Sequence, residues 1–526
     1  MSHPPVPPVP PEPHGQPQQQ SGPYGQPYPH QPGPYGQQIP QGVGYGAQNP
    51  YAQPYPQPPL QAPVQTGPGG PGGPGGPSGK RRRLVVVLGS VVAALLVIGV
   101  GAVALLSGDQ GSERADGKTK GTPRSASPKP TGTKGTELFQ VAAPKEGEDE
   151  YVQTPGAWVT SRYFASGEKN AVTGYDLATG RRAWTIPLSG GLCGASRDIT
   201  GSGLVAVVFH ATKDTHNSLC SRFAVIDVNK GATVWEKPIV DKSISLGLGL
   251  NVAISDSVAA AGWPSGSAGF TTSGGAPLWV APAQGCAQEE HLGGRKLLTL
   301  AYCQTSAGMR FRVGEHDPRT GKATWTYQVP KARGAWLVSS EPLVLGLVQS
   351  EDGLDAEQLV TVSDQGKVES TVELGDDYVA GCGETGACAA TVVAGNTAYI
   401  GTDPHSYTTG NKITAFDLRT GKPLRSFDAT DKSTWVPLRA DGKALIALQT
   451  AEPTTPARVL RLDPGTSQAT KLLEMPNELA VNSMLHSMIS KDGEDPALYE
   501  DGQLFLHDAG AYQAAVNPMT LAFSNR

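Results

Sequence analysis

The chain after residue 145 consists of short apolar runs separated by turn-forming residues. The clearest runs are Leu204–Phe209, Leu297–Tyr302, Leu343–Val348 and Ala444–Leu448. Runs of this length, rich in Val, Leu and Ile and bounded by Gly, Asp, Asn or Ser, are typical of β-strands. Almost no segment of this region has the 3.6-residue period of a long amphipathic helix. The pattern therefore predicts an all-β fold.

A ten-residue phrase returns between these strands, most clearly as Tyr175–Trp184 and His316–Trp325. Other copies, some of them degenerate, are Ile226–Trp235, Phe416–Arg425, Leu462–Thr466, Phe270–Trp279, Val362–Gly366 and Val516–Thr520. Successive copies are separated by 44 to 54 residues. This is about the length of one four-stranded propeller blade. The region is therefore expected to be a repeat protein with one blade per copy.

Each conserved position of the phrase has a physical role in a turn between two strands. The Asp carboxylate can accept backbone N–H groups two residues further on, and the Gly can adopt the positive φ that a short hairpin requires. The Trp opens the next strand and has enough area to pack against a neighbouring blade. The positions concerned are Asp176, Gly180, Trp184, Asp227, Gly231, Trp235, Gly275, Trp279, Asp317, Gly321, Trp325, Asp417, Gly421 and Asp463.

The phrase resembles the repeat of the pyrroloquinoline quinone-like (PQQ-like) β-propeller family, in which a strand ends in Ala-Leu-Asp and Thr-Gly and Lys-x-x-Trp follow. The resemblance covers about 380 residues and implies a propeller of four-stranded blades. Eight copies predict eight blades, or seven if Val516–Thr520 is not a true copy. The ring is expected to close through residues 139–154, which would complete the last blade.

All six cysteines lie after residue 190, and their number is even. They form three local couples, which predicts the disulfides Cys193–Cys220, Cys286–Cys303 and Cys382–Cys388. Disulfides indicate an oxidising compartment outside the cytoplasm. Metal binding or thiol chemistry is the alternative, but no Cys-x-x-Cys is present and the histidines are scattered singly. No metal-ligating residue is therefore proposed.

The amino-terminal part divides into segments that do not resemble the repeats. Residues 1–79 are rich in Pro, Gly, Gln and Tyr and are expected to be a disordered cytoplasmic tail. Residues 80–106 contain a basic flank and an uncharged apolar run that as a helix would measure about 34 Å, enough to cross a bilayer core of about 30 Å. Residues 107–137 have linker composition. The propeller is assigned to residues 138–526.

The basic flank of Lys80, Arg81, Arg82 and Arg83 predicts a cytoplasmic amino terminus with the propeller outside the plasma membrane. A buried core helix or a cleaved signal peptide is the alternative for the apolar run, although it is longer than a usual signal sequence. Beyond residue 106 the chain holds 38 Lys and Arg against 46 Asp and Glu. This acidic balance argues against nucleic acid as a partner.

The resemblance implies two functional classes: quinone-dependent dehydrogenases and non-catalytic propellers such as a lipoprotein subunit of the outer-membrane barrel-assembly machinery. The dehydrogenases use a disulfide between adjacent cysteines and a Ca²⁺ site, and this sequence has no adjacent cysteines. The resemblance therefore implies no catalytic or cofactor-binding residue in this sequence. The chain is expected to be a non-enzymatic membrane protein without a cofactor, although PQQ with calcium is not excluded.

The leading hypothesis for function is a binding or scaffolding module that recognises envelope proteins or cell-wall ligands. The loops Ala211–Ser218 and Asp403–Gly410 are candidate contacts, because they differ in length between repeats. A quinone-dependent oxidoreductase is one alternative. A receptor-like sensor that signals through the Pro-rich tail is another.

Overall fold

The computed structural model describes residues 132–526 apart from 144–150, 214–218, 240–249, 283–285, 287, 307, 318, 351–354, 376, 381–387, 389–390, 404–409, 430–432, 453, 490–496 and 513–517. The tail and membrane segment expected over residues 1–106 lie outside the described residues, as does nearly all of the expected linker. Within the described ranges, no helix is long and apolar enough to cross a membrane.

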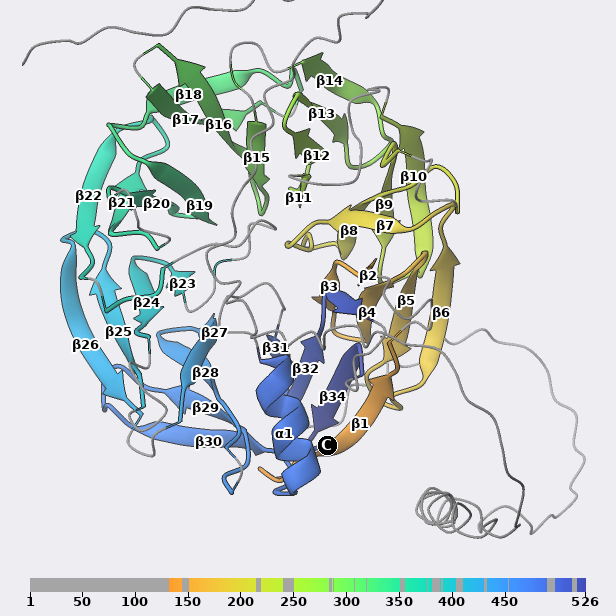
Figure 1. Ribbon diagram of the computed structural model, residues 1–526, viewed down its shortest axis with the longest axis vertical. Helices are drawn as coiled ribbons and strands as arrows, with labels where there is room; N and C mark the ends of the chain where they lie inside the picture. The colour runs from red at the N-terminus through yellow and green to blue at the C-terminus, as the bar shows by residue number, and fades with distance from the viewer. Residues whose placement is uncertain are drawn as a thin grey trace, which may run out of the picture. The chain divides into compact units, whose positions relative to one another are not determined.

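The propeller consists of eight four-stranded antiparallel sheets arranged as blades around a central axis (Figure 1). Seven blades are built from four consecutive strands, from the axis outward. Blade 1 contains β3 (Ala157–Val159), β4 (Tyr163–Glu168), β5 (Ala171–Asp176) and β6 (Arg182–Pro187), and blade 2 contains β7 (Leu192–Ala195), β8 (Leu204–Phe209), β9 (Arg222–Asp227) and β10 (Ala232–Pro238). Blade 3 contains β11 (Asn251–Ile254), β12 (Val258–Trp263), β13 (Gly266–Thr271) and β14 (Pro277–Pro282). Blade 4 contains β15 (Gln288–Leu292), β16 (Leu298–Thr305), β17 (Gly308–His316) and β18 (Ala323–Gln328).

Blades 5 to 7 continue this order. Blade 5 contains β19 (Gly334–Ser340), β20 (Leu343–Val348), β21 (Gln358–Val362) and β22 (Val368–Glu373). Blade 6 contains β23 (Thr391–Ala394), β24 (Thr397–Gly401), β25 (Lys412–Asp417) and β26 (Lys422–Asp428). Blade 7 contains β27 (Trp435–Asp441), β28 (Ala444–Gln449), β29 (Arg458–Leu462) and β30 (Ala469–Glu474). The all-β prediction and the count of eight blades are confirmed.

Blade 8 joins the two ends of the propeller. Its strands from the axis outward are β31 (Ala497–Glu500), β32 (Gln503–His507), β34 (Thr520–Ser524) and β1 (Thr136–Val141). In Figure 1 the orange β1 lies beside the dark blue β34. A second pairing joins β2 (Tyr151–Gln153) to β33 (Gly510–Tyr512). The predicted closure of the ring by the amino-terminal segment is therefore confirmed, although β1 starts two residues before the expected boundary at 138.

The motif turns have the predicted geometry. The Asp176 carboxylate accepts the backbone N–H groups of Ala178 and Thr179, each at 3.1 Å. Asp317, Asp417 and Asp463 accept equivalent bonds two residues further on. The motif glycines have positive φ, for example 67° at Gly180. In blade 7 a serine, Ser467, takes this position at φ 59°.

The motif tryptophans join neighbouring blades, as the sequence predicts. A Cβ built on Gly231 of blade 2 would lie 2.4 Å from Cγ of Trp184 in blade 1. The same relation links Gly275 to Trp235 at 2.7 Å and Gly321 to Trp279 at 2.5 Å. Each of these tryptophans therefore rests on a glycine of the following blade, where a side chain would leave no room for the indole.

One feature departs from the all-strand pattern. Helix α1 (Leu479–Met488) connects blades 7 and 8 and buries Leu485 and Met488 in an apolar cluster. That cluster includes Leu473 of β30 and Leu504 of β32. The helix therefore seals the joint between the seventh and eighth blades.

Candidate functional site: the central channel

A cavity of about 640 Å³ lies along the axis of the ring. Its lining includes residues from the innermost strand of every blade, namely β3, β7, β11, β15, β19, β23, β27 and β31. Each of these strands has a single hydrogen-bonded neighbour within its own four-stranded sheet, so its other edge is turned toward the axis. The cavity is therefore a product of the closed ring, because no single blade contains it.

The cavity wall combines apolar side chains with a few charged groups. Leu250, Val252 and Leu292 contribute the apolar part of the wall in blades 3 and 4. Arg197 and Asp198 follow β7, and Arg439 lies on β27. Both signs of charge are thus present on a partly apolar surface, a composition typical of sites that bind organic ligands.

The charged groups of the wall are held by specific neighbours. Arg439 donates from Nε to the carbonyl oxygen of Tyr499 at 2.8 Å and lies 3.5 Å from Glu500 through Nη2. Burial raises the pKa of Asp198, while the Arg197 guanidinium acts in the opposite direction. Burial also raises the pKa of Asp508, against a hydrogen bond from the Gly510 backbone. These groups are therefore positioned before any ligand binds.

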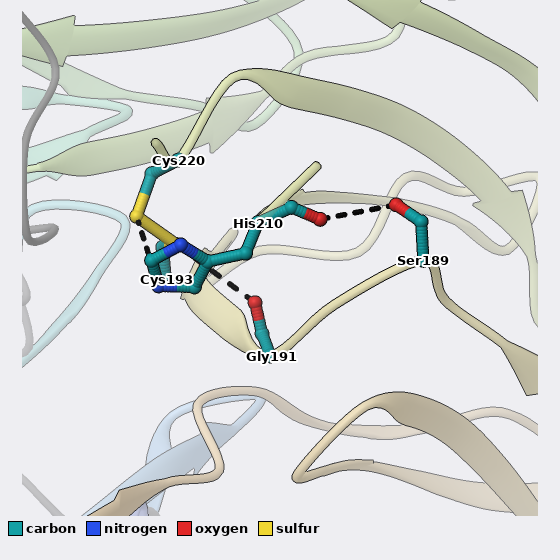
Figure 2. The surroundings of a disulfide bond; sticks show 5 residues. All are labelled: Ser189, Gly191, Cys193, His210 and Cys220. Atoms are coloured by element: carbon teal, nitrogen blue, oxygen red, sulfur yellow. Dashed lines mark hydrogen bonds between the residues drawn. A yellow bond between two sulfur atoms is a disulfide. The ribbon is translucent and has the colours of Figure 1, made fainter. Parts of the chain in front are cut away.

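The disulfide Cys193–Cys220 forms part of this wall, with an S–S distance of 2.03 Å. Cys193 lines the cavity, whereas Cys220 is fully buried. Figure 2 shows His210 beside the bond, with Nε2 3.7 Å from the Cys220 sulfur. The potential ligand atoms of these three residues lie within 4.8 Å of one another. The two sulfurs are bonded to each other, so neither is a thiolate ligand in this state.

Two of the three predicted disulfides are confirmed, since Cys286 is also bonded to Cys303. The Cys286–Cys303 bond links the segment before β15 to β16. Cys388 is disulfide-bonded and lines the channel cavity. Its predicted partner Cys382 lies outside the described residues.

A buried acid beside the channel was not predicted from the sequence. Glu290 on β15 accepts a hydrogen bond of 2.9 Å from the Tyr302 hydroxyl, which also lies 3.2 Å from the carbonyl oxygen of Ala335. Burial raises the pKa of Glu290 to about 7, although the bond from Tyr302 acts in the opposite direction. One glutamate within a predicted strand does not indicate a buried acid, because the burial of its side chain depends on contact with the next blade.

The motif residues lie away from this cavity, in the turns between the third and outermost strands and, for the tryptophans, on the outermost strands themselves. They therefore build the propeller and do not contribute to the channel wall. Of the candidate contact loops, only residues 211–213, 403 and 410 are described. None of these five lines the cavity.

Comparisons with known proteins return solved structures only. No protein-family model matches the sequence, and no curated protein matches it. A structure titled "The crystal structure of BamB from Moraxella catarrhalis" matches with a TM-score of 0.41 and 13% identity, over 74% of this chain and 99% of that chain. A dihydro-heme d1 dehydrogenase, NirN, matches with a TM-score of 0.40 and 12% identity, over 63% and 69%. U3-55K matches with a TM-score of 0.37 and 7% identity, over 74% and 99%.

Proposed function

We propose that the protein is a membrane-anchored binding module of the cell envelope, and that its central channel holds an extended segment of a partner protein. The observation that carries this proposal is the composition of the cavity, which takes lining residues from the inner strands of all eight blades. A volume of about 640 Å³ lies within the range of about 300 to 1,000 Å³ that is usual for ligand sites. The membrane anchor and the outside location rest on the sequence pattern of residues 80–106.

The backbone of the inner strands favours an extended polypeptide as the ligand. An inner strand pairs on one side with the second strand of its blade and presents its other edge to the channel. Peptides that add to such an edge gain affinity from main-chain hydrogen bonds and specificity from alternate side chains. The apolar wall and the charges of Arg197 and Arg439 would then select the side chains.

A quinone cofactor is not part of this proposal. The two described disulfides join residues separated by 27 and 17 positions, so neither provides the adjacent-cysteine platform that the resembling dehydrogenases use.

Site-specific photo-crosslinking of the full-length protein in its native membrane tests the proposal. A photo-reactive residue at position 440 of β27, on the channel wall, is compared with one at position 234, which lies on outer strand β10. We expect position 440 to capture the same protein reproducibly, and Ser339→Trp, which places an indole on the channel wall, to reduce that yield at least tenfold.

Position 234 should not capture this protein. Equal capture at both positions, or a yield at position 440 that Ser339→Trp leaves unchanged, would exclude the channel as the binding site. A thermal shift of the purified protein with PQQ and Ca²⁺, absent with Ca²⁺ alone, would replace the proposal with an oxidoreductase.

A further inference from the structure

The joint between blades 6 and 7 lacks the tryptophan that fills the corresponding joints of blades 1 to 4. The cross-strand register pairs Trp184 with Gly174 and pairs Arg425 with Ala415, so Arg425 occupies the tryptophan position of blade 6. The position that Gly231 holds in blade 2 is taken in blade 7 by Ser467. The Arg425 guanidinium donates a hydrogen bond to the Ser467 hydroxyl. A polar contact therefore replaces the stacking of an indole on glycine.

A pocket of about 520 Å³ is found at this joint. Its wall comes from both blades: Tyr399, Ala415 and Arg425 belong to blade 6, whereas Lys443 belongs to the turn between β27 and β28 of blade 7. The hydroxyl of Tyr399 donates to the carbonyl oxygen of Lys443 at 2.8 Å, which fixes one blade against the other. The pocket therefore lies between blades 6 and 7, beside the Arg425 side chain that takes the tryptophan position.

The charge of the pocket is positive. Among the described residues that line it, Arg425 and Lys443 are cationic and none is acidic. Carboxylates of the surrounding turns have partners of their own, since Asp417 pairs with Arg419 at 3.4 Å and Arg461 pairs with Asp441 at 3.1 Å and with Asp463 at 3.8 Å. An anion entering the pocket would meet two cations without a competing acid.

The pocket also offers apolar surface. Leu424 beside Arg425 is 58% exposed, although it is a large aliphatic side chain. Tyr399 and Ala415 form a buried floor, with exposed fractions of 3% and 1%. A ligand that combines a ring with an acidic group would match both parts of this surface.

We propose that this pocket binds a small aromatic anion, whose ring lies against Tyr399, Ala415 and Leu424 and whose acidic group contacts Arg425 and Lys443. The site is separate from the central channel, because the two sets of lining residues do not overlap. It does not depend on the proposed channel function.

Indole-3-acetate is a suitable probe, because it supplies an indole and a carboxylate in one molecule. We expect the full-length protein in detergent micelles to bind it saturably in isothermal titration calorimetry. Tryptamine, which carries the same ring with a positive charge, should bind at least tenfold more weakly. An absence of saturable indole-3-acetate binding up to its solubility limit, or equal binding of tryptamine, would overturn the proposal.

Variants locate the binding within the molecule. Lys443→Gln should weaken indole-3-acetate binding by about threefold to tenfold, because an exposed cation contributes a modest amount to anion binding. Lys422→Gln removes an exposed cation of β26, the strand that carries Arg425, outside the pocket and should leave the affinity unchanged. Equal effects of the two substitutions would show that only general surface charge attracts the probe.

A filled-pocket variant provides a test that keeps the fold intact. Arg425→Trp combined with Ser467→Gly recreates the tryptophan–glycine contact of blades 1 to 4. We expect this double variant to abolish binding of indole-3-acetate while its Tm stays at or above that of the wild type. Retention of wild-type affinity in a folded double variant would place the probe elsewhere.

Discussion

The five-membered ring of Trp184 in blade 1 covers Gly231 in blade 2, so that a Cβ on Gly231 would lie 2.4 Å from Trp184 Cγ. The glycine has φ 62°, a conformation that L side chains rarely adopt. Two separate penalties therefore oppose a side chain at this position: backbone strain and overlap with the indole.

Gly231→Ala is predicted to lower the free energy of unfolding by about 2 to 4 kcal/mol, from about 1–2 kcal/mol of strain and a further overpacking cost. Gly442 has φ 61° with no atom within 4 Å of a Cβ placed on it. Gly442→Ala should therefore show the strain alone. Chemical denaturation of both variants measures the difference, and equal losses would show that the indole contact does not matter.

Removal of the Cys193–Cys220 bond is predicted to destabilise the protein by about 3 to 4 kcal/mol. The bond closes a chain segment with a sequence separation of 27, and its loss restores conformational entropy to the unfolded chain. The midpoint of urea denaturation of Cys193→Ala/Cys220→Ala should fall relative to the oxidised wild type. A midpoint equal to that of the oxidised wild type would contradict the prediction.

Low pH is predicted to lower the stability of the folded protein through His507, which lies where the ring closes. The imidazole Nε2 lies 2.7 Å from the carbonyl oxygen of Thr154, and Nδ1 lies 2.9 Å from the Thr520 hydroxyl. Burial lowers the pKa of His507 to about 4, against the ordinary 6.5, so the unfolded chain binds a proton more readily. The stabilisation is complete above pH 6.5 and is lost as the pH falls toward 4.

The variant His507→Gln can keep both hydrogen bonds but cannot titrate. The difference in unfolding free energy between wild type and variant should therefore shift in favour of the variant by on the order of 3 kcal/mol from pH 7 to pH 4. Urea denaturation at several pH values measures it. The exposed His486→Gln is the control, and a pH profile of His507→Gln parallel to that of the wild type would refute the assignment.

Glu290 is predicted to give the opposite pH dependence, with the folded protein stabilised at low pH. Its pKa is raised to about 7 by burial, so the folded state binds the proton more tightly than the unfolded chain. The contribution to stability is present below the ordinary pKa of about 4.5 and is lost as the pH rises through 7. A protonated Glu290 can donate to the Tyr302 oxygen, which frees the tyrosine proton for the carbonyl oxygen of Ala335.

Glu290→Gln should therefore become more stable relative to the wild type as the pH rises from 4.5 to 8, by on the order of 3 kcal/mol. Thermal denaturation over this range measures the trend. Glu137→Gln on β1, an exposed position, should follow the wild type at every pH. A Glu290→Gln variant that tracks Glu137→Gln would show that Glu290 is ionised in the folded protein across the range.

The motif made the fold predictable because Asp, Gly and Trp act through local geometry. Asp176 closes its turn through residues two and three positions away, and the sequence shows that spacing directly. The packing of Trp184 against a neighbouring blade was also predictable, since the motif tryptophan recurs in blades 1 to 4. The local spacing of Cys193 and Cys220 was enough to pair them.

Other features depend on contacts that no local pattern records. Helix α1 begins after Glu478, which makes no side-chain capping hydrogen bond, so the usual helix-start signal is missing. The environment of Glu290 arises where blade 4 meets blade 5, through Tyr302 and Ala335. Ser467 adopts a conformation that sequence rules assign to glycine. The channel itself exists only once all eight blades have assembled.

The pairing of β1 with β34 also imposes an order on biosynthesis. Thr136 is paired with Ser524, so β1 cannot pair with β34 until nearly 400 further residues have been synthesised. A ribosome that has delivered seven blades has therefore produced an open arc with an unpaired leading strand, exposed to chaperones and proteases. Only translation through Ser524 converts that arc into a closed ring.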